Sequence, residues 1–345
     1  MSNLFLVTGG AGFLGINLCR YLLSRHHSVR SLDIAAFDYP EKTAVDAIQG
    51  DVRDRAAVCR AMKRVDVVVH CAAALPLCSK GEIFSTNVAG TRVVLECALQ
   101  ERVSRMIQIS STAVYGIPDH HPICEDDRLQ GVGPYGESKI EAERLCEEFR
   151  PKGLCVPILR PKSFVGPERL GAFELLYQWA YKGRNFPVLG SGDNRYQLLD
   201  VEDLCDAIYL CATTEANLAN ATFNVAAAQF GSMRDNFQAV LDRAGHGKRV
   251  IRLPARIATA ILKILEQLHL SPFYKWIYES AARESFVSID RIQKTLGFIP
   301  RFSNREALIR NYDWYVAHRD QIGTTGTSHR VAWKKGALRI AECLF

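Results

Sequence analysis

A glycine-rich turn near the start of the chain limits its possible folds more than any other feature. The segment Thr8-Gly9-Gly10-Ala11-Gly12-Phe13-Leu14-Gly15 follows a short apolar run, Leu4–Thr8, that is typical of a buried strand. It also opens the stretch Phe13–Arg25, whose leucines recur at helical spacing. Three of its glycines have the G-x-G-x-x-G spacing of a turn that lets backbone approach a dinucleotide pyrophosphate. The pattern predicts a strand, a phosphate-binding turn and a helix, in that order.

The first half of the chain continues to alternate strand-like and helical patterns. Strands are predicted at Val29–Ile34, Asp66–His70, Arg105–Ser111 and Leu154–Arg160, and helices at Arg55–Lys63, Phe84–Gln100 and Tyr135–Phe149. Strands that are apolar on both faces and alternate with long helices predict an α/β fold. The expected architecture is a Rossmann-type, doubly wound parallel sheet.

After Pro161 this alternation ends, although a helix at Asp203–Thr213 and a further strand at Phe223–Ala226 are still expected. We therefore expect an NAD-binding Rossmann domain over residues 1–167 and about 198–228. A smaller, mixed substrate-binding lobe is expected over 168–197 and 229–322, followed by a basic amphipathic tail over 323–345.

An acidic residue stands at the end of the second predicted strand, 18 residues beyond Gly15. A carboxylate here accepts hydrogen bonds from the adenosine ribose and repels a 2′-phosphate, so Asp33 favours NAD over NADP. The alternative is that Asp33 only caps a turn. Asp51 follows the next short run and is expected near the adenine.

Tyr135 and Lys139 share one face of a predicted helix, four residues apart. The preceding strand ends at Ser110 and Ser111, at the edge of the sheet where the nicotinamide is expected. Removing a proton from an alcohol while its hydride leaves requires a base, and a nearby ammonium favours the phenolate form of a tyrosine. Ser111 supplies a hydroxyl that can hold the substrate oxygen. The alternative is that Tyr135 packs and Lys139 is solvated.

Composition excludes several other classes of protein. Of 345 residues, 48% are apolar and 23% charged, which excludes a disordered or collagen-like chain. Half of the net charge of +6 lies near the C-terminus, so the nearly neutral remainder gives no reason to expect nucleic-acid binding.

The eleven cysteines include no C-x-x-C pair, so neither a metal site nor a disulfide framework is expected. Cys19, Cys97, Cys146, Cys205 and Cys211 are interpreted as reduced core residues, which favours a cytoplasmic protein.

Two other segments bear on membrane contact. The run Ile257–Leu270 contains charged and polar residues and is too short to span a bilayer. The tail is consistent either with a helix that contacts a membrane surface or partner, or with an ordinary packed terminus, which we favour. Because Leu4–Thr8 meets glycines at once, no signal peptide is expected.

These motifs together resemble the extended short-chain dehydrogenase/reductase family, in its NAD-dependent epimerase/dehydratase group. The resemblance spans roughly residues 3 to 320. Besides the glycine turn, it rests on Asp51-Val52, His70-Cys71-Ala72-Ala73, Asn87-Val88-Ala89-Gly90-Thr91, Ser110 to Gly116, Tyr135-Gly136-Glu137-Ser138-Lys139, Leu159-Arg160-Pro161 and Val165-Gly166-Pro167.

The resemblance implies an enzyme that holds NAD tightly and often forms a homodimer on the helix carrying Tyr135. It assigns Ser111, Tyr135 and Lys139 as the catalytic triad. The implied cofactor-binding residues are Gly9, Gly10, Gly12, Phe13, Leu14, Gly15, Asp33, Asp51, Val52, Ala72, Ala73, Asn87, Tyr135, Lys139 and Pro161.

The substrate is harder to predict. Dehydratases of this family carry acidic residues just after the position of Ser111, where this chain has Thr112 and Ala113. Nucleotide-sugar members usually have asparagine at the Ser163 position and arginine at that of Tyr196, with Arg195 here one residue early. We take Ser111, Thr112, Ser163, Arg195 and Tyr196 as the substrate-binding candidates.

The favoured interpretation is a nucleotide-sugar 4-epimerase that acts by transient oxidation at C4. The alternatives are a 3β-hydroxysteroid or sterol-type dehydrogenase or reductase, and an inactive NAD-sensing scaffold. The intact triad argues against the scaffold.

Overall fold

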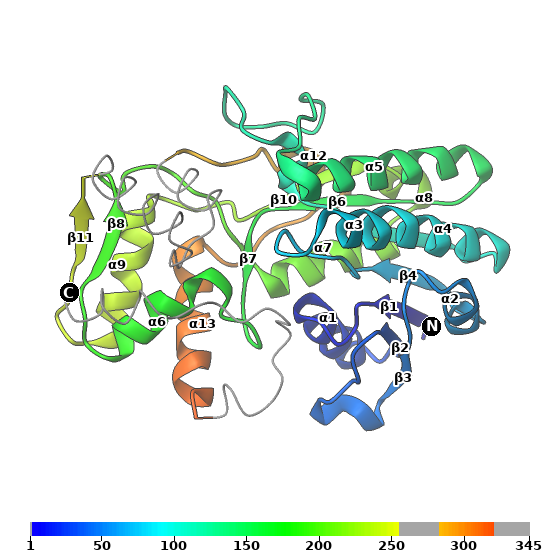
Figure 1. Ribbon diagram of the computed structural model, residues 1–345, viewed down its shortest axis with the longest axis horizontal. Coiled ribbons are helices and arrows are strands. Elements are labelled where there is room, and N and C mark those ends of the chain that lie inside the picture. Colours follow the sequence, from blue (N-terminus) through cyan, green and yellow to red (C-terminus); the bar gives the residue numbers. More distant parts are fainter. Residues whose placement is uncertain (1, 255–282, 321–345) are drawn as a thin grey trace. The chain divides into compact units, whose positions relative to one another are not determined.

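The computed structural model describes residues 2–254 and 283–320, and the packing of the chain divides it into two units (Figure 1). Unit 1 comprises Met1–Phe164, Val201–Ala226 and Val287–Pro300; unit 2 comprises Val165–Asp200, Ala227–Phe286 and Arg301–Phe345.

The division differs from the expected domains most clearly at residues 287–300, which the sequence analysis placed in the substrate-binding lobe. They belong to unit 1 because Val287 forms a parallel bridge with Ile123, and helix α12 (Asp290–Leu296) packs against strand β10 (Thr222–Val225). The stretch 257–270 and the tail 323–345 lie outside the described residues.

Unit 1 is built on a seven-stranded sheet in the order β10-β6-β5-β4-β1-β2-β3, and all paired neighbours are parallel. The expected doubly wound parallel sheet is confirmed. The remaining six strands are β1 (Leu4–Thr8), β2 (Ser28–Asp33), β3 (Val45–Gln49), β4 (Val67–His70), β5 (Arg105–Ile109) and β6 (Ile158–Pro161).

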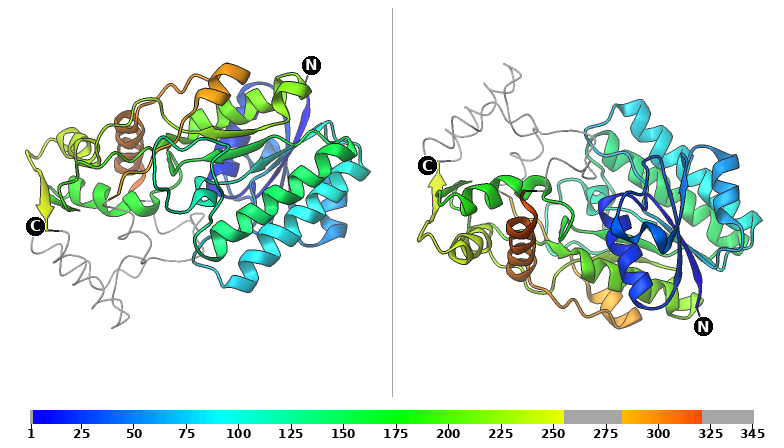
Figure 2. Two further views of the ribbon diagram at one scale, coloured as in Figure 1. Left: turned by 90° about the horizontal axis from the view of Figure 1, so that it is seen from above. Right: turned by 90° about the horizontal axis from the view of Figure 1, so that it is seen from below.

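Helices cover both faces of this sheet. On one face lie α2 (Arg55–Met62), α4 (Thr91–Gln100) and α5 (Gly133–Phe149), of which α4 and α5 run side by side (Figure 2). On the other, α1 (Phe13–Ser24) packs against α7 (Val201–Thr213). Two short helices, α3 (Lys80–Phe84) and α8 (Ala216–Ala219), complete unit 1. Because strand residues such as Leu6, Val68 and Met106 are fully buried, the sheet is the core of this unit.

The single helix predicted at Phe84–Gln100 is interrupted. A π-helical turn at Ser85–Gly90 separates α3 from α4, and such turns recur at functional sites. Here it contains Asn87, whose contacts are described below.

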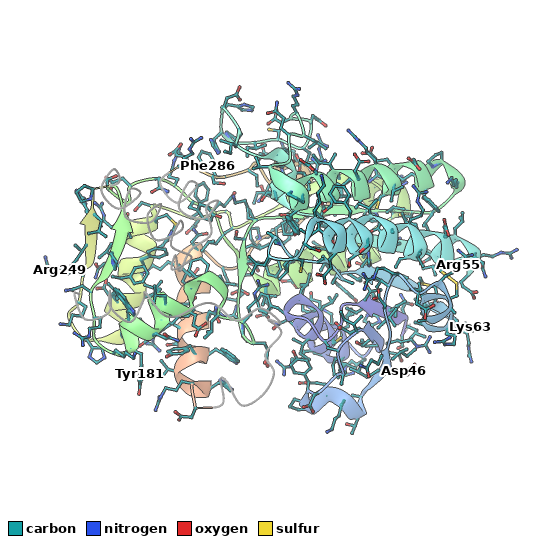
Figure 3. All side chains as sticks on the ribbon, viewed as in Figure 1. Asp46, Arg55, Lys63, Tyr181, Arg249 and Phe286 are labelled. Atoms are coloured by element: carbon teal, nitrogen blue, oxygen red, sulfur yellow. A yellow bond between two sulfur atoms is a disulfide. The ribbon has the colours of Figure 1, made fainter. Side chains whose placement is uncertain are left out.

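One cysteine prediction was wrong. Cys97 of α4 is bonded to Cys59 of α2, so it is not a reduced thiol. The two helices pack side by side, which brings together two sulfur atoms that are 38 residues apart in sequence. In Figure 3 the bond lies near Arg55 and Lys63, at the two ends of α2. The other four predicted core cysteines, at positions 19, 146, 205 and 211, are buried.

Unit 2 has an aromatic-rich core. Its helices α6 (Glu174–Tyr181), α9 (Met233–Ala244) and α13 (Asn304–His318) enclose Tyr177, Phe237 and Tyr312. Strands β8 (Phe186–Leu189) and β11 (Val250–Leu253) form a parallel pair. The described residues also include the two-residue strands β7 (Phe164–Val165) and β9 (Leu199–Asp200).

None of the helices within residues 2–254 and 283–320 combines the length and the apolar character that crossing a bilayer requires.

Candidate functional site

The turn after β1 is packed so tightly that only glycine fits at its key positions. Gly9 has a φ of 68°, and a Cβ there would lie 2.8 Å from the backbone nitrogen of Ala72. A Cβ on Gly15 would lie 2.2 Å from the carbonyl oxygen of Gly9, and one on Gly10 would lie 2.2 Å from Oγ of Ser31. The glycine spacing therefore brings α1 directly against the turn.

The start of α1 suits an anionic group. Its N-cap, Gly12, has no side chain to offer, and the first turn Phe13-Leu14-Gly15-Ile16 contains no acidic residue. The amino end of a helix carries a partial positive charge and N–H donors without helical partners. Phe13 stacks on Phe164 with ring centroids 5.4 Å apart, which fixes one side of this end. These features fit the pyrophosphate of a dinucleotide.

Asp33 lies beside the same turn. One of its carboxylate oxygens accepts a hydrogen bond from the backbone N–H of Ala11 (3.1 Å), and the other accepts from Ala35 (2.8 Å). It therefore does cap the turn. Because each carboxylate oxygen has two lone-pair sites, Asp33 retains capacity to accept hydrogen bonds from ribose hydroxyls.

Other predicted cofactor residues follow the carboxyl ends of the parallel strands β3 and β4. The carboxylate of Asp51 forms an ion pair with Arg53 at 2.5 Å. Val52 is buried. Ala72 and Ala73 are half-buried in the segment after β4, and the N–H of Ala72 donates to Oγ1 of Thr8 (3.3 Å).

The side chain of Asn87 links the segment after β4 to α5. Its amide accepts from the N–H of Ala74 (2.7 Å) and donates to the carbonyl of Ala74 (3.1 Å) and to Oγ of Ser138 (3.0 Å). Ser138 in turn donates to the carbonyl of Tyr135 (2.8 Å). Asn87 is a predicted cofactor residue, and in this structure its amide joins two parts of the protein.

At the ends of β1 and β4 lies a series of buried, hydrogen-bonded polar side chains that were not among the predicted site residues. Nδ1 of His70 lies 2.6 Å from Oγ1 of Thr8, and its Nε2 lies 3.1 Å from Oγ1 of Thr91. Burial, together with the charge of Lys139, lowers the pKa of His70 to about 3, so the imidazole is neutral at pH 7. A histidine directly after three valines of a buried strand was the available signal.

The structure brings Tyr135 and Lys139 together on α5. Nζ of Lys139 lies 5.8 Å from the ring centroid of Tyr135 and donates to the carbonyl oxygen of Ile109 at the end of β5 (3.0 Å). Burial lowers the pKa of Lys139 to about 8, and the charge of Glu143 opposes part of this shift. Since this value lies above 7, the ammonium form predominates at neutral pH.

Ser111 follows β5 in an extended conformation and caps a short 3₁₀ turn, Thr112–Tyr115, through a hydrogen bond from the N–H of Ala113 to its Oγ (3.1 Å). Ser111 and Thr112 are half-buried. Ile109 is two residues before Ser111 and accepts from Lys139. One short stretch of chain therefore carries Ser111 and binds Lys139, and Tyr135 lies one turn before Lys139 on α5.

The predicted substrate residues carry less information. Ser163 is exposed just after β6, which ends at the buried Pro161, a predicted cofactor residue. In unit 2 the guanidinium of Arg195 is exposed and forms a forked ion pair with Glu284 (2.8 and 3.0 Å). It also lies 4.3 Å from the ring centroid of Phe286, which Figure 3 labels. Tyr196 is half-buried, and its carbonyl accepts from the amide of Asn304 (2.6 Å).

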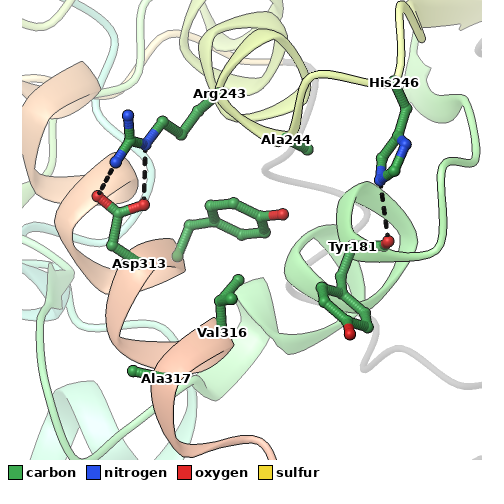
Figure 4. A pocket seen from close by; sticks show the side chains of 8 residues that line it. Tyr181, Arg243, Ala244, His246, Asp313, Val316 and Ala317 are labelled. Atoms are coloured by element: carbon green, nitrogen blue, oxygen red, sulfur yellow. Dashed lines mark hydrogen bonds and ion pairs between the residues drawn. The ribbon is translucent and has the colours of Figure 1, made fainter.

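Unit 2 also contains a hollow of about 520 Å³ (Figure 4). An ion pair between Arg243 and Asp313 (2.9 Å) lies on one side, and Nε2 of His246 lies 3.2 Å from the carbonyl of Tyr181 on another. None of the predicted substrate residues lines it.

The sequence of residues 5–226 matches that of the NAD dependent epimerase/dehydratase family. The chain belongs to this family. The expected family membership, the expected enzyme class and the expected cofactor, NAD, are thereby confirmed. The match covers most of unit 1, including the glycine turn, Ser111, Tyr135 and Lys139.

Three relatives are similar to this protein over most of the chain. An uncharacterised protein, y4nG, of Sinorhizobium fredii is 33% identical over 95% of this chain and 82% of its own length. The low-salt glycan biosynthesis protein Agl12 of Haloferax volcanii is 34% identical, covering 71% and 88%. A 3β-hydroxysteroid dehydrogenase/Δ5→4-isomerase of Mycobacterium tuberculosis is 25% identical, covering 95% and 94%.

Solved structures agree on the fold. The epimerase Mth375 of Methanothermobacter thermautotrophicus superposes with a TM-score of 0.78 at 23% identity, covering 94% of this chain and 95% of its own. The UDP-glucose 4-epimerase of Thermotoga maritima gives 0.76 at 21% identity, covering 92% and 99%.

Proposed function

We propose that this protein is a nucleotide-sugar 4-epimerase that works by transient oxidation at C4. The observation that carries the proposal is the arrangement of Tyr135, Lys139 and Ser111 at the end of β5, followed by the uncharged pair Thr112 and Ala113. The first three residues supply the proton acceptor, the ammonium and the hydroxyl that alcohol oxidation needs. The last two lack the acidic and basic side chains that elimination needs.

In this mechanism Tyr135 accepts the proton of the C4 hydroxyl, while Ser111 holds the same oxygen by a hydrogen bond. The ammonium of Lys139 stabilises the phenolate through space and binds the nicotinamide ribose. NAD, when bound, supplies the hydride acceptor and later the hydride donor. Tyr135 then returns the proton after the sugar has presented its other face.

The residues around the site favour epimerisation over dehydration. Elimination of water from C5 and C6 needs an acid and a base beside the substrate, and neither Thr112 nor Ala113 titrates near neutral pH. A sugar substrate is also supported by the relative Agl12, whose name assigns that protein to glycan biosynthesis. We further propose that unit 1 binds NAD, that unit 2 selects the substrate and that the protein forms a homodimer through α5.

A second candidate is a dehydrogenase acting on a steroid-like alcohol. It is supported by the hydroxysteroid dehydrogenase relative, which is similar over 95% of the chain, and by Ser163 at the position of the usual asparagine.

The two candidates differ in how they use NAD. An epimerase regenerates its cofactor, so purified protein with bound NAD should convert its substrate with none added. The experiment is a panel of UDP-, dTDP-, GDP- and CDP-sugars and sterols, screened by thermal shift and then by product analysis. Turnover of a nucleotide sugar without added NAD supports the proposal. Accumulation of reduced nicotinamide with a sterol would replace it with the second candidate.

Asp33→Ala is expected to weaken NAD binding by roughly ten- to a hundredfold and to relax discrimination against NADP. The charged hydrogen bonds to ribose are lost, and so is the repulsion of a 2′-phosphate. Because Asp33 also holds the N–H of Ala11, Asp33→Asn serves as the matched variant that keeps an acceptor without the charge. Calorimetric titration with NAD and NADP checks this, and an unchanged NAD preference in both variants would exclude the ribose role.

A further inference from the structure

A buried ion pair lies beneath the proposed catalytic residues, one helical turn beyond Lys139. Glu143 of α5 is only 2% exposed and Arg160 of β6 only 3%. Nη2 of Arg160 donates to Oε2 of Glu143 (2.6 Å), and its Nε lies 3.0 and 3.1 Å from the two carboxylate oxygens. A fork of this kind fixes the carboxylate in one orientation.

Arg160 is itself held from the other side. Its Nη1 donates to the hydroxyl of Tyr115 (2.8 Å) and to the carbonyl of Glu125 (2.9 Å). The hydroxyl of Tyr115 donates onward to Oδ1 of Asn224 in β10 (2.8 Å). The hydroxyl of Tyr115 and the carbonyl of Glu125 therefore hold the guanidinium in place, and the guanidinium holds Glu143.

Glu143 also contacts the strand end that carries Ser111. The hydroxyl of Ser110 donates to Oε1 of Glu143. Since successive side chains of an extended chain point to opposite sides, Ser110 faces α5 and the core while Ser111 faces away. One turn earlier on α5, Lys139 donates to the carbonyl of Ile109. Two adjacent turns of the helix are thus bonded to two consecutive residues, Ile109 and Ser110, of the same strand end.

The charge of Glu143 matters because Lys139 is almost fully buried, at 4% exposure. Burial disfavours the ammonium, and the negative charge of Glu143 is the largest influence that restores it. Among the described residues, the other titratable groups near Lys139 are two neutral thiols, a neutral imidazole and the proposed catalytic tyrosine: Cys71, Cys146, His70 and Tyr135.

We infer that Glu143 is a positioning residue for the catalytic pair: held by Arg160 and Ser110, its carboxylate keeps the buried Lys139 charged and fixes α5 against the end of β5. This inference rests on the proposed role of Lys139 beside Tyr135. It adds a residue to the site that touches neither substrate nor cofactor.

The test reads the charge of Lys139 directly and needs no substrate. Full-length protein labelled with ¹³Cε-lysine is titrated with pH by NMR, and the Lys139 signal is identified by its absence in Lys139→Arg. The wild-type midpoint is expected at about pH 8. Glu143→Gln is expected to move it down by about one pH unit or more, because one nearby negative charge is lost.

The matched control is Glu147→Gln, the same change one turn further along α5 at an exposed position. The Lys139 midpoint in this variant should stay at the wild-type value, because solvent screens the charge of Glu147. A folded Glu143→Gln protein with an unchanged midpoint would overturn the inference.

Because Glu143→Gln leaves Arg160 buried without its partner, that variant risks unfolding. The double variant Glu143→Gln/Arg160→Met removes both charges and keeps the test decisive. A downward shift in the double variant supports the inference, and a wild-type midpoint contradicts it. Ser110→Ala, which retains the ion pair, should lower turnover through misplacement of Ser111 while leaving the midpoint close to that of the wild type.

This outcome is separable from that of the proposed function. If Tyr135→Phe retained turnover, the proposed mechanism would fail whatever the Lys139 titration showed. If Tyr135→Phe were inactive and the Lys139 midpoint did not respond to Glu143, only the present inference would fail.

Discussion

Replacing Tyr135 by phenylalanine is expected to lower turnover by about 10²- to 10⁴-fold while leaving NAD affinity nearly unchanged. The substitution removes one phenolic oxygen, the only atom of this side chain that can accept the substrate proton. The ring remains in place above Lys139, and the glycine turn that binds the pyrophosphate is untouched. The measurement combines steady-state turnover of the substrate found in the panel with calorimetric titration of NAD.

Tyr209→Phe is the matched control, since it removes a hydroxyl of α7 that lies 3.2 Å from Nε2 of His27. It should retain full turnover. Substantial activity in Tyr135→Phe would remove Tyr135 as the base, and with it the proposed mechanism.

Gly15→Ala is expected to abolish measurable NAD binding and to destabilise the fold by about 3 kcal/mol. The added Cβ would lie 2.2 Å from the carbonyl oxygen of Gly9 and 2.6 Å from Cα of Gly10, so α1 must move away from the turn. Both contacts are to backbone atoms, which cannot move aside as a side chain can. Denaturant unfolding and NAD titration measure the two effects.

Gly81→Ala provides the control, because a Cβ at this position of α3 meets nothing within 4 Å. It should bind NAD normally and be slightly more stable, since alanine favours helix over glycine. Normal NAD binding in Gly15→Ala would show that close packing of α1 on the turn is not what forms the phosphate site.

Most of unit 1 could be predicted from the sequence, because the patterns that mark its strands and helices are local. Three valines before His70 mark a buried strand, and the i, i+4 pair of Tyr135 and Lys139 follows from helical spacing alone. Strand β3 was missed because it lies at the sheet edge, where only Val45 of its five residues is buried and Asp46 faces Arg30 of β2.

Other features depend on contacts that no local pattern encodes. The bond between Cys59 and Cys97 arises from how α2 packs on α4. The amide of Asn87 finds Ala74 and Ser138 only once the sheet has formed, and Glu143 meets Arg160 in the same way. The sequence shows that these residues are polar, but it does not show which residues they contact.

Unit 2 was least predictable. Its aromatic core, built from α6, α9 and α13, has no spacing as regular as that of alternating strands and helices. Arg195 is an example: its residue type makes it a substrate-binding candidate, and only the structure shows its ion pair with Glu284. Whether a substrate displaces that pair is a question for the ligand panel.

The central claim is that hydride leaves and returns to the same carbon within one bound substrate. It is tested most directly with the nucleotide sugar selected by the panel, labelled with deuterium at C4 and incubated with the protein and no added NAD. We expect the C4 epimer with its deuterium fully retained at C4. Loss of the label to solvent, or a keto product with accumulated reduced nicotinamide, would contradict it.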